Sequence, residues 1–126
     1  NEAGWQPMRR LAPSPWLAHL PDEFPIYQWH NDTFAIPDGA VHLLSSPWCA
    51  HQGFSWGNKL LALQGHPEMT VELIEEWFRA AGHLLDETQP SQEKRVQTCE
   101  NLSLKVAAMN RLAAGLYTHW LDLANA

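Results

Sequence analysis

The feature that most constrains the fold is a change of pattern near residue 70. Before it, short apolar runs are separated by proline, glycine, asparagine and aspartate, as in a series of strands and turns. After it, apolar residues recur every three or four positions, which is typical of amphipathic helices. The sequence therefore predicts an α/β fold in which the strands come first and the helices follow.

Five apolar stretches of the first part are predicted strands. They cover residues 4–10, 24–30, 41–46, 51–56 and 59–64. Gly57 and Asn58 separate the last two, so these should pair as a hairpin. The last stretch is apolar on both faces at residues 60–63, as expected of a strand that is covered on both sides.

Two helical regions are predicted after these strands. Thr70 is a suitable N-cap for a helix that ends near Asp86, and Ser91 is a suitable cap for the next one. From Ser91 to Ala126 no proline or strand signal interrupts the pattern. The apolar residues of this region form one helical stripe: Leu102, Val106, Met109, Ala113, Leu116, Trp120 and Leu123. The stripe either packs on the body of the fold or forms a dimer seam, and its alanine and tryptophan favour packing.

Charge and hydropathy exclude several functional classes. The chain has 14 acidic and 8 basic residues, a net charge of −6, and its basic residues are scattered. No basic stripe could follow a phosphate backbone, so no nucleic-acid partner is predicted. The longest apolar run is too short to span a bilayer, and no signal peptide is recognisable at the N-terminus. We therefore expect no membrane partner and a cytoplasmic location.

The cysteines and histidines show no metal-binding spacing. Cys49 and Cys99 are far apart and form no Cys-x-x-Cys pair, and the seven histidines include no His-x-x-x-His. The sequence predicts no metal site and no cofactor.

His66-Pro67-Glu68 is the segment with the clearest chemical meaning. It follows the apolar strand and precedes the helix at Thr70, which is the edge of an α/β sheet where active sites gather. A carboxylate that accepts the proton on one imidazole nitrogen leaves the other nitrogen free to act as a base. Taken alone, the tripeptide is more often just a turn before a helix. The surrounding sequence therefore has to distinguish a plain turn from a catalytic His–Glu pair.

Several segments of the chain match one family in order. Residues 63–70 read Leu-Gln-Gly-His-Pro-Glu-Met-Thr and resemble the Gln-Phe-His-Pro-Glu motif of class I glutamine amidotransferases, with Gly65 in place of the usual Phe. Upstream, residues 1–5 resemble the family's Glu-Ile-Gly-Trp, and residues 29–34 its Trp-His-Gly-Asp-Thr-Phe. Residues 36–46 resemble its Leu-Pro-x-Gly-Ala and Leu-Ala-x-Ser pieces, and residues 49–54 its Cys-x-x-Gln-Ala-Phe. The resemblance covers roughly residues 1–80 and is closest to the GMP-synthase-like, stand-alone branch.

The resemblance implies a fold and a reaction. Residues 1–86 would be the C-terminal half of a three-layer α/β/α (flavodoxin-like) glutamine amidotransferase domain, and residues 87–126 a helical extension packed on it. The family hydrolyses the side-chain amide of glutamine through a Cys–His–Glu triad and a γ-glutamyl thioester. His66 and Glu68 would be the histidine and the glutamate. The ammonia would pass to a synthase domain or subunit.

A second pair, His30 and Asp32, lies at the end of a predicted strand. The two residues either line the glutamine pocket or, with Asn31, simply form the turn.

The family's cysteine lies in a Gly-x-Cys-x-Gly-x-Gln elbow, and this chain contains no such motif. Cys49 matches a position that is not the nucleophile and lacks the flanking glycines of an elbow. The chain begins with Asn1 and runs at once into a strand, so we expect a fragment of a longer protein. We expect this fragment to be inactive alone and to self-associate through the surface that the missing half would cover.

Two other functions remain open at this stage. The chain could be a non-catalytic binding module or a homologue without the nucleophile. The intact protein could also be a γ-glutamyl hydrolase that acts on a substrate other than glutamine.

Overall fold

One five-stranded sheet forms the centre of the molecule. The computed structural model describes residues 1–126. Its strands are β1 (Glu2–Arg10), β2 (Glu23–His30), β3 (Val41–Ser45), β4 (Gly53–Trp56) and β5 (Leu60–Leu63). Their order is β2-β1-β3-β4-β5, and every neighbouring pair is antiparallel. All five predicted strands are confirmed, as is the hairpin formed by β4 and β5.

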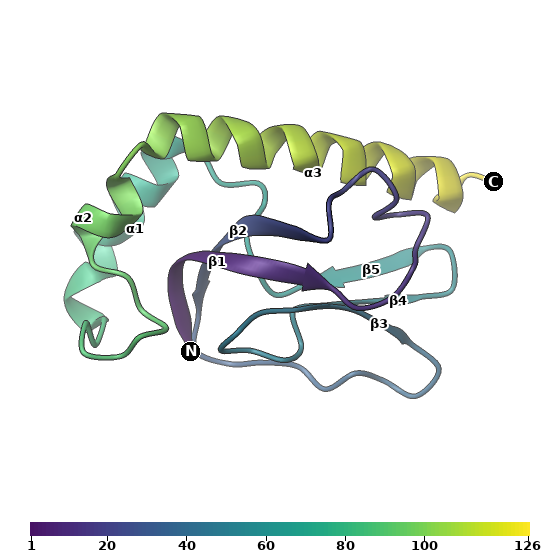
Figure 1. Ribbon diagram of the computed structural model, residues 1–126, viewed down its shortest axis with the longest axis horizontal. Coiled ribbons are helices and arrows are strands. Elements are labelled where there is room, and N and C mark those ends of the chain that lie inside the picture. The colour runs from purple at the N-terminus through teal and green to yellow at the C-terminus, as the bar shows by residue number, and fades with distance from the viewer.

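The helices follow the sheet in the chain, as the pattern after residue 70 predicts. They are α1 (Val71–Ala81), a short 3₁₀ turn η1 (Gly82–Leu84), α2 (Arg95–Cys99) and α3 (Leu102–Ala124). Thr70 caps α1, because its side chain accepts a hydrogen bond from the backbone N–H of Leu73 at 3.2 Å. Figure 1 shows α3 lying along the sheet, with α1 and α2 near its N-terminal end. The α/β class predicted from the sequence is confirmed.

The prediction for residues 91–101 is wrong in two respects. Ser91 caps no helix; it is buried, and its carbonyl accepts a hydrogen bond from Ala3 of β1 at 3.0 Å. Glu93 N–H returns a bond to the carbonyl of Ala3 at 2.9 Å, so this segment adds a short bridge to the sheet. The helix that follows is also interrupted, because Asn101 has a left-handed φ of 52°, which asparagine tolerates better than most residues.

The sheet and α3 share one hydrophobic core. Five of the seven stripe residues of α3 are buried, namely Leu102, Val106, Met109, Ala113 and Leu116. All of these except Ala113 belong to one cluster with Trp5, Phe24 and Tyr27 of β1 and β2 and with Ile74 and Phe78 of α1. The stripe therefore packs on the body of the fold, as its composition favours. The division of the chain at residue 86 stays a prediction, although residues on both sides of it contribute to this core.

No helix of the structure combines the length and the apolar character needed to cross a membrane.

Candidate functional site

The His66 turn lies where the two edges of the sheet approach each other. β2 and β5 are the outer strands of the sheet order, yet the backbone N–H of His66, which follows β5, donates to the carbonyl of Tyr27 in β2 at 2.8 Å. The sheet is therefore curled, since a flat sheet would keep its edge strands apart. The curl places the turn after β5 against β2 and gives it a fixed support.

Gly65 makes this close approach possible. A side-chain Cβ at this position would lie 2.5 Å from Nε2 of Gln28 and 2.6 Å from Cγ2 of Ile26. Both neighbours belong to β2, and both are buried. At Gly65 the family usually has Phe. In this chain the missing side chain leaves the space that the close contact with β2 needs.

Substituting Gly65 should destabilise the fold. We expect Gly65→Ala to lower the free energy of unfolding by about 1–3 kcal/mol, as forced overpacking in a filled interior does. Urea unfolding followed by tryptophan fluorescence measures this change. Gly82→Ala is the matched control: its Cβ would be 3.4 Å from Phe78, and its helical φ of −59° suits alanine, so its stability should stay equal or rise. Equal stability of both variants would contradict the close-contact explanation.

His66 and Glu68 are in direct contact. Nδ1 of His66 lies 2.8 Å from Oε1 of Glu68. Since a carboxylate accepts, Nδ1 carries the proton, and Nε2 keeps its lone pair and makes no hydrogen bond within the chain. The His66 side chain is 29% exposed and that of Glu68 is 55% exposed. The pair thus presents a free imidazole nitrogen to solvent.

Aromatic side chains surround the pair. The ring of Trp77 meets the ring of His66 edge to face, with the centroids 5.1 Å apart, and restricts its rotation. Tyr117 of α3 lies on the side of Glu68. Burial, and then the negative charge of Glu68, raise the pKa of the Tyr117 phenol above its usual value. Tyr117 therefore stays a neutral phenol beside the carboxylate.

Asn110 of α3 holds the turn from the other side. Its Nδ2 donates to the carbonyls of Pro67 and Met69, each at 3.1 Å. These two carbonyls flank Glu68 in the chain. The turn that carries the His–Glu pair is thus fixed to β2 through His66 and to α3 through Asn110.

The second predicted pair, His30 and Asp32, is brought together, but through the backbone. Nδ1 of His30 lies 2.8 Å from the main-chain carbonyl of Asp32, while the Asp32 carboxylate makes no hydrogen bond within the chain. Nε2 of His30 faces inward to the buried carboxylate of Glu2 at 2.9 Å. The Nε2 side of the imidazole therefore faces the interior, and the exposed part of this segment is residues 31–33.

The two predicted sites are neighbours. Nε2 of Gln64 donates to the carbonyl of Asp32 at 2.7 Å, which joins the turn at residues 30–32 to the residue two positions before His66. A surface pocket of about 290 Å³ opens beside this turn, and its lining includes Asn31, Asp32 and Thr33.

Cys49 is not paired with His66. Its Sγ lies 3.4 Å from Oγ1 of Thr33 and 3.8 Å from the carbonyl of His51, and no hydrogen bond connects it with the imidazole of His66. That Cys49 is not the nucleophile stays a prediction.

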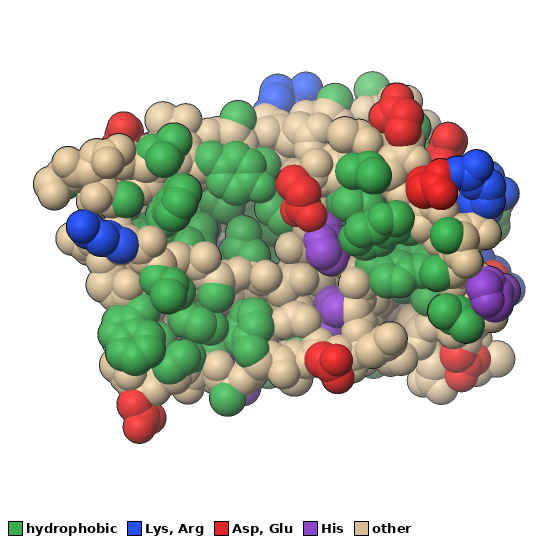
Figure 2. Space-filling model, turned by 180° about the vertical axis from the view of Figure 1, so that it is seen from behind, with side chains coloured by type: hydrophobic (Ala, Val, Ile, Leu, Met, Phe, Trp, Pro, Cys, Tyr) green, Lys and Arg blue, Asp and Glu red, His purple; other side chains and the backbone are tan.

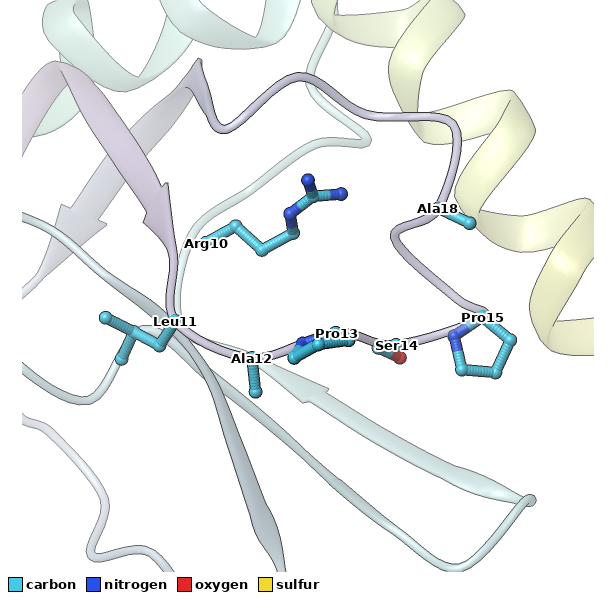
Figure 3. Close-up of a pocket in the computed structure, with 7 residues that line it drawn as sticks. All are labelled: Arg10, Leu11, Ala12, Pro13, Ser14, Pro15 and Ala18. Atoms are coloured by element: carbon cyan, nitrogen blue, oxygen red, sulfur yellow. The ribbon is translucent and has the colours of Figure 1, made fainter.

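A larger pocket, of about 560 Å³, lies away from these residues, in the loop after β1 (Figure 3). Its one charged side chain is Arg10, whose guanidinium is already bound to the carbonyls of Leu17 and Leu20 and to the carboxylate of Asp22. The arginine therefore holds the loop in place and is not free to bind a charged ligand in the pocket.

Sequence reasoning did not find the residues that support these sites. Asn110, Trp77 and Tyr117 come from helices with ordinary amphipathic patterns, so no local signal marks them. Glu2 and Gln52 lie within the matched motifs, but Glu2 precedes the predicted strand at residues 4–10, so the sequence did not mark it as buried.

Comparison with known proteins agrees with the motif resemblance. No family model matches the chain. The candidate glutamine amidotransferase-like protein YfeJ of Salmonella typhimurium is 33% identical over 81 residues, which cover 64% of this chain and 33% of that protein. A candidate glutamine amidotransferase of Saccharomyces cerevisiae is 29% identical over 87 residues, covering 68% of this chain and 35% of that protein. The chain thus spans about a third of the length of the curated relatives it matches.

Solved structures extend the match to almost the whole chain. A crystal structure of a glutamine amidotransferase from Methylobacillus flagellatus has a TM-score of 0.89 and 31% identity, over 97% of this chain and 52% of that one. A second, from Thermotoga maritima, has a TM-score of 0.83 at 24% identity, over 97% of this chain and 51% of that one, and shows the fold alone. Coverage of about half fits the expected half domain. By sequence and by fold, this chain is similar to glutamine amidotransferases and matches about half of each solved structure.

Proposed function

We propose that this chain supplies the general base and the orienting carboxylate of a glutaminase site. The observation that carries the proposal is the 2.8 Å contact between His66 Nδ1 and Glu68 Oε1, which leaves His66 Nε2 free at the surface. The carboxylate fixes the Nδ1–H tautomer and stabilises the imidazolium that forms when Nε2 takes a proton. This is the arrangement that activates a thiol or hydroxyl nucleophile.

In the proposed reaction the nucleophile is a cysteine that lies outside this chain. Nε2 of His66 accepts the thiol proton as the sulfur attacks the side-chain amide carbon of glutamine. The same proton then passes to the leaving nitrogen, so ammonia departs and a γ-glutamyl thioester remains. His66 next removes a proton from water, which attacks the thioester and releases glutamate, and the proton returns to the thiol.

The turn at residues 30–32 is proposed to bind the substrate. It is linked to the His66 turn through Gln64, and it borders an open pocket. The inward orientation of His30 means that its exposed neighbours Asn31 and Asp32 would make the contacts. The Asp32 carboxylate has no partner within the chain and could accept the α-amino group of glutamine. The released ammonia would pass to an acceptor on a separate domain or subunit.

The chain by itself should release no ammonia from glutamine. It holds the proposed base and carboxylate but no activated thiol, because Cys49 contacts Thr33 and His51 and makes no hydrogen bond to His66. A coupled glutamate dehydrogenase assay on the purified chain measures this directly. Glutamine-dependent ammonia release that disappears in Cys49→Ala would show that the nucleophile lies in this chain after all.

We further propose that another polypeptide surface covers part of this chain. Hydrophobic side chains gather on one face of the molecule (Figure 2). Across the whole chain, the large hydrophobic residues Trp48, Trp56 and Leu121 are at least half exposed. In the isolated chain a second copy would serve as the cover. Sedimentation velocity should therefore show a dimer or larger species at micromolar concentration, and a monomer across that range would contradict this.

A further inference from the structure

The carboxylate of Glu2 is the most deeply buried charged group of the sheet. Its side chain is 0% exposed. Oε1 accepts a hydrogen bond from Oγ of Ser46 at 2.6 Å, and Oε2 accepts one from Nε2 of Gln52. The same amide of Gln52 carries a buried oxygen, Oε1, that has no partner, so the polar shell around Glu2 is not closed.

His30 completes the surroundings of Glu2. Its Nδ1 donates to the carbonyl of Asp32, because a carbonyl only accepts. In a neutral imidazole Nε2 would then carry a lone pair, and it faces Oε2 of Glu2 at 2.9 Å. Two lone pairs do not approach this closely, so either a proton, on the imidazole or on the carboxyl group, or a metal ion lies between them.

Cys49 adds a third ligand atom of a different kind. Its Sγ, the Nε2 of His30 and a carboxylate oxygen of Glu2 all lie within 4.8 Å of one another. Cys49 is partly buried, and its loop is fixed by the hydrogen bond from its backbone N–H to Oγ of Ser46 at 3.1 Å. Both His30 and Cys49 also line the 290 Å³ surface pocket, so two of the three groups border a solvent-filled space.

We propose that Glu2, His30 and Cys49 form a binding site for Zn²⁺. One carboxylate oxygen, one imidazole nitrogen and one thiolate are ligands that Zn²⁺ accepts, at bond lengths of about 2.0–2.3 Å. Small shifts of the three side chains would bring them to this spacing. The fourth position would face the pocket and take water or a small anion, as in zinc sites with three protein ligands.

The surrounding hydrogen bonds fit this assignment. Metal-bound histidines almost always donate their other ring N–H to a carbonyl or carboxylate, and metal-bound carboxylates are hydrogen-bonded in turn. The bond from His30 to Asp32 and those from Ser46 and Gln52 to Glu2 are of these kinds. The ion would join the start of β1, the end of β2 and the loop before β4, and so stiffen the turn at residues 30–32. The site is argued from this geometry alone and does not rest on the proposed function.

Isothermal titration of the chelator-treated chain with ZnCl₂ tests the proposal. We expect one ion per chain with a micromolar or tighter dissociation constant. Cys49→Ser should weaken binding by at least about tenfold, since the loss of even an outer partner costs about 10- to 100-fold. Cys99→Ser, which removes the other partly buried free cysteine, is the matched control and should leave the affinity unchanged.

Cobalt substitution identifies the ligands independently. Co²⁺ bound at this site should show a thiolate-to-metal charge-transfer band in the near ultraviolet, present in Cys99→Ser and absent in Cys49→Ser. Circular dichroism confirms that each variant is folded, and Cys49→Ala replaces Cys49→Ser if the latter is not. Absence of Zn²⁺ binding, equal affinity in the Cys49 and Cys99 variants, or a cobalt spectrum without a Cys49-dependent band would overturn the proposal and leave a shared proton between His30 and Glu2.

Discussion

Replacing His66 with alanine should lower glutamine turnover by about 10²–10⁴-fold in an active protein that contains this chain, because it removes the general base. The free Nε2 of His66 is the group that would take the thiol proton, and no other imidazole contacts Glu68. The loss should appear in kcat more than in KM, since the base acts in the chemical steps and not in substrate binding. Steady-state ammonia release over a range of glutamine concentrations separates the two.

His83→Ala is the control for this prediction. His83 is exposed in η1 and makes no side-chain hydrogen bond, so its replacement should leave both constants near those of the unmodified protein. Near-normal turnover of the His66 variant, with the fold verified by circular dichroism, would remove His66 from the proposed mechanism.

Replacing Glu2 with alanine should cost a large part of the total stability. The change leaves His30, Ser46 and Gln52 without their shared acceptor in a buried site. Removing one member of a buried charged pair typically costs about 3–5 kcal/mol, whereas a domain of this kind is stable by about 5–15 kcal/mol in all. Urea unfolding in the presence of a chelator, followed by tryptophan fluorescence, excludes any contribution from bound metal.

Glu23→Ala is the matched variant for the Glu2 prediction. Glu23 is the first residue of β2, is exposed and makes no hydrogen bond through its side chain. Its loss should change the free energy of unfolding by less than about 0.5 kcal/mol. If the two variants were equally stable, Glu2 would not be the organising group of this part of the sheet.

Local patterns in the sequence were sufficient to predict most of the secondary structure. Short apolar runs between turn residues identified the five strands, and Thr70 marked the start of α1 through its capping chemistry. The spacing of His66 and Glu68 also anticipated their contact, because residues two apart across a proline turn stay close. In each case the decisive interactions are local in the chain.

The rest of the fold depends on contacts between distant residues. The curl that places His66 against Tyr27, and the hydrogen bonds from Asn110 to the turn, join residues about 40 positions apart. Residues 91–93 carry helix-like composition, but pairing with Ala3 of β1 prevails over that local preference. The break at Asn101 likewise has no proline or glycine to announce it.

The site around Glu2 also depends on residues that are far apart in the sequence. Its candidate ligands come from the first strand, the end of the second and the loop before the fourth, so no short spacing such as Cys-x-x-Cys could reveal them. Only the sheet register, which places Glu2 opposite His30, brings these groups together.

We propose that His66 and Glu68 act as one unit, a base and the carboxylate that orients it. The most direct measurement is the turnover of glutamine in His66→Ala, Glu68→Ala and the double variant of an active protein that contains this chain. Residues that act as a unit are strongly non-additive, so the double variant should be no more than a few-fold slower than His66→Ala alone. A double variant slowed by the full product of the two single effects would show that His66 and Glu68 act independently, contrary to this proposal.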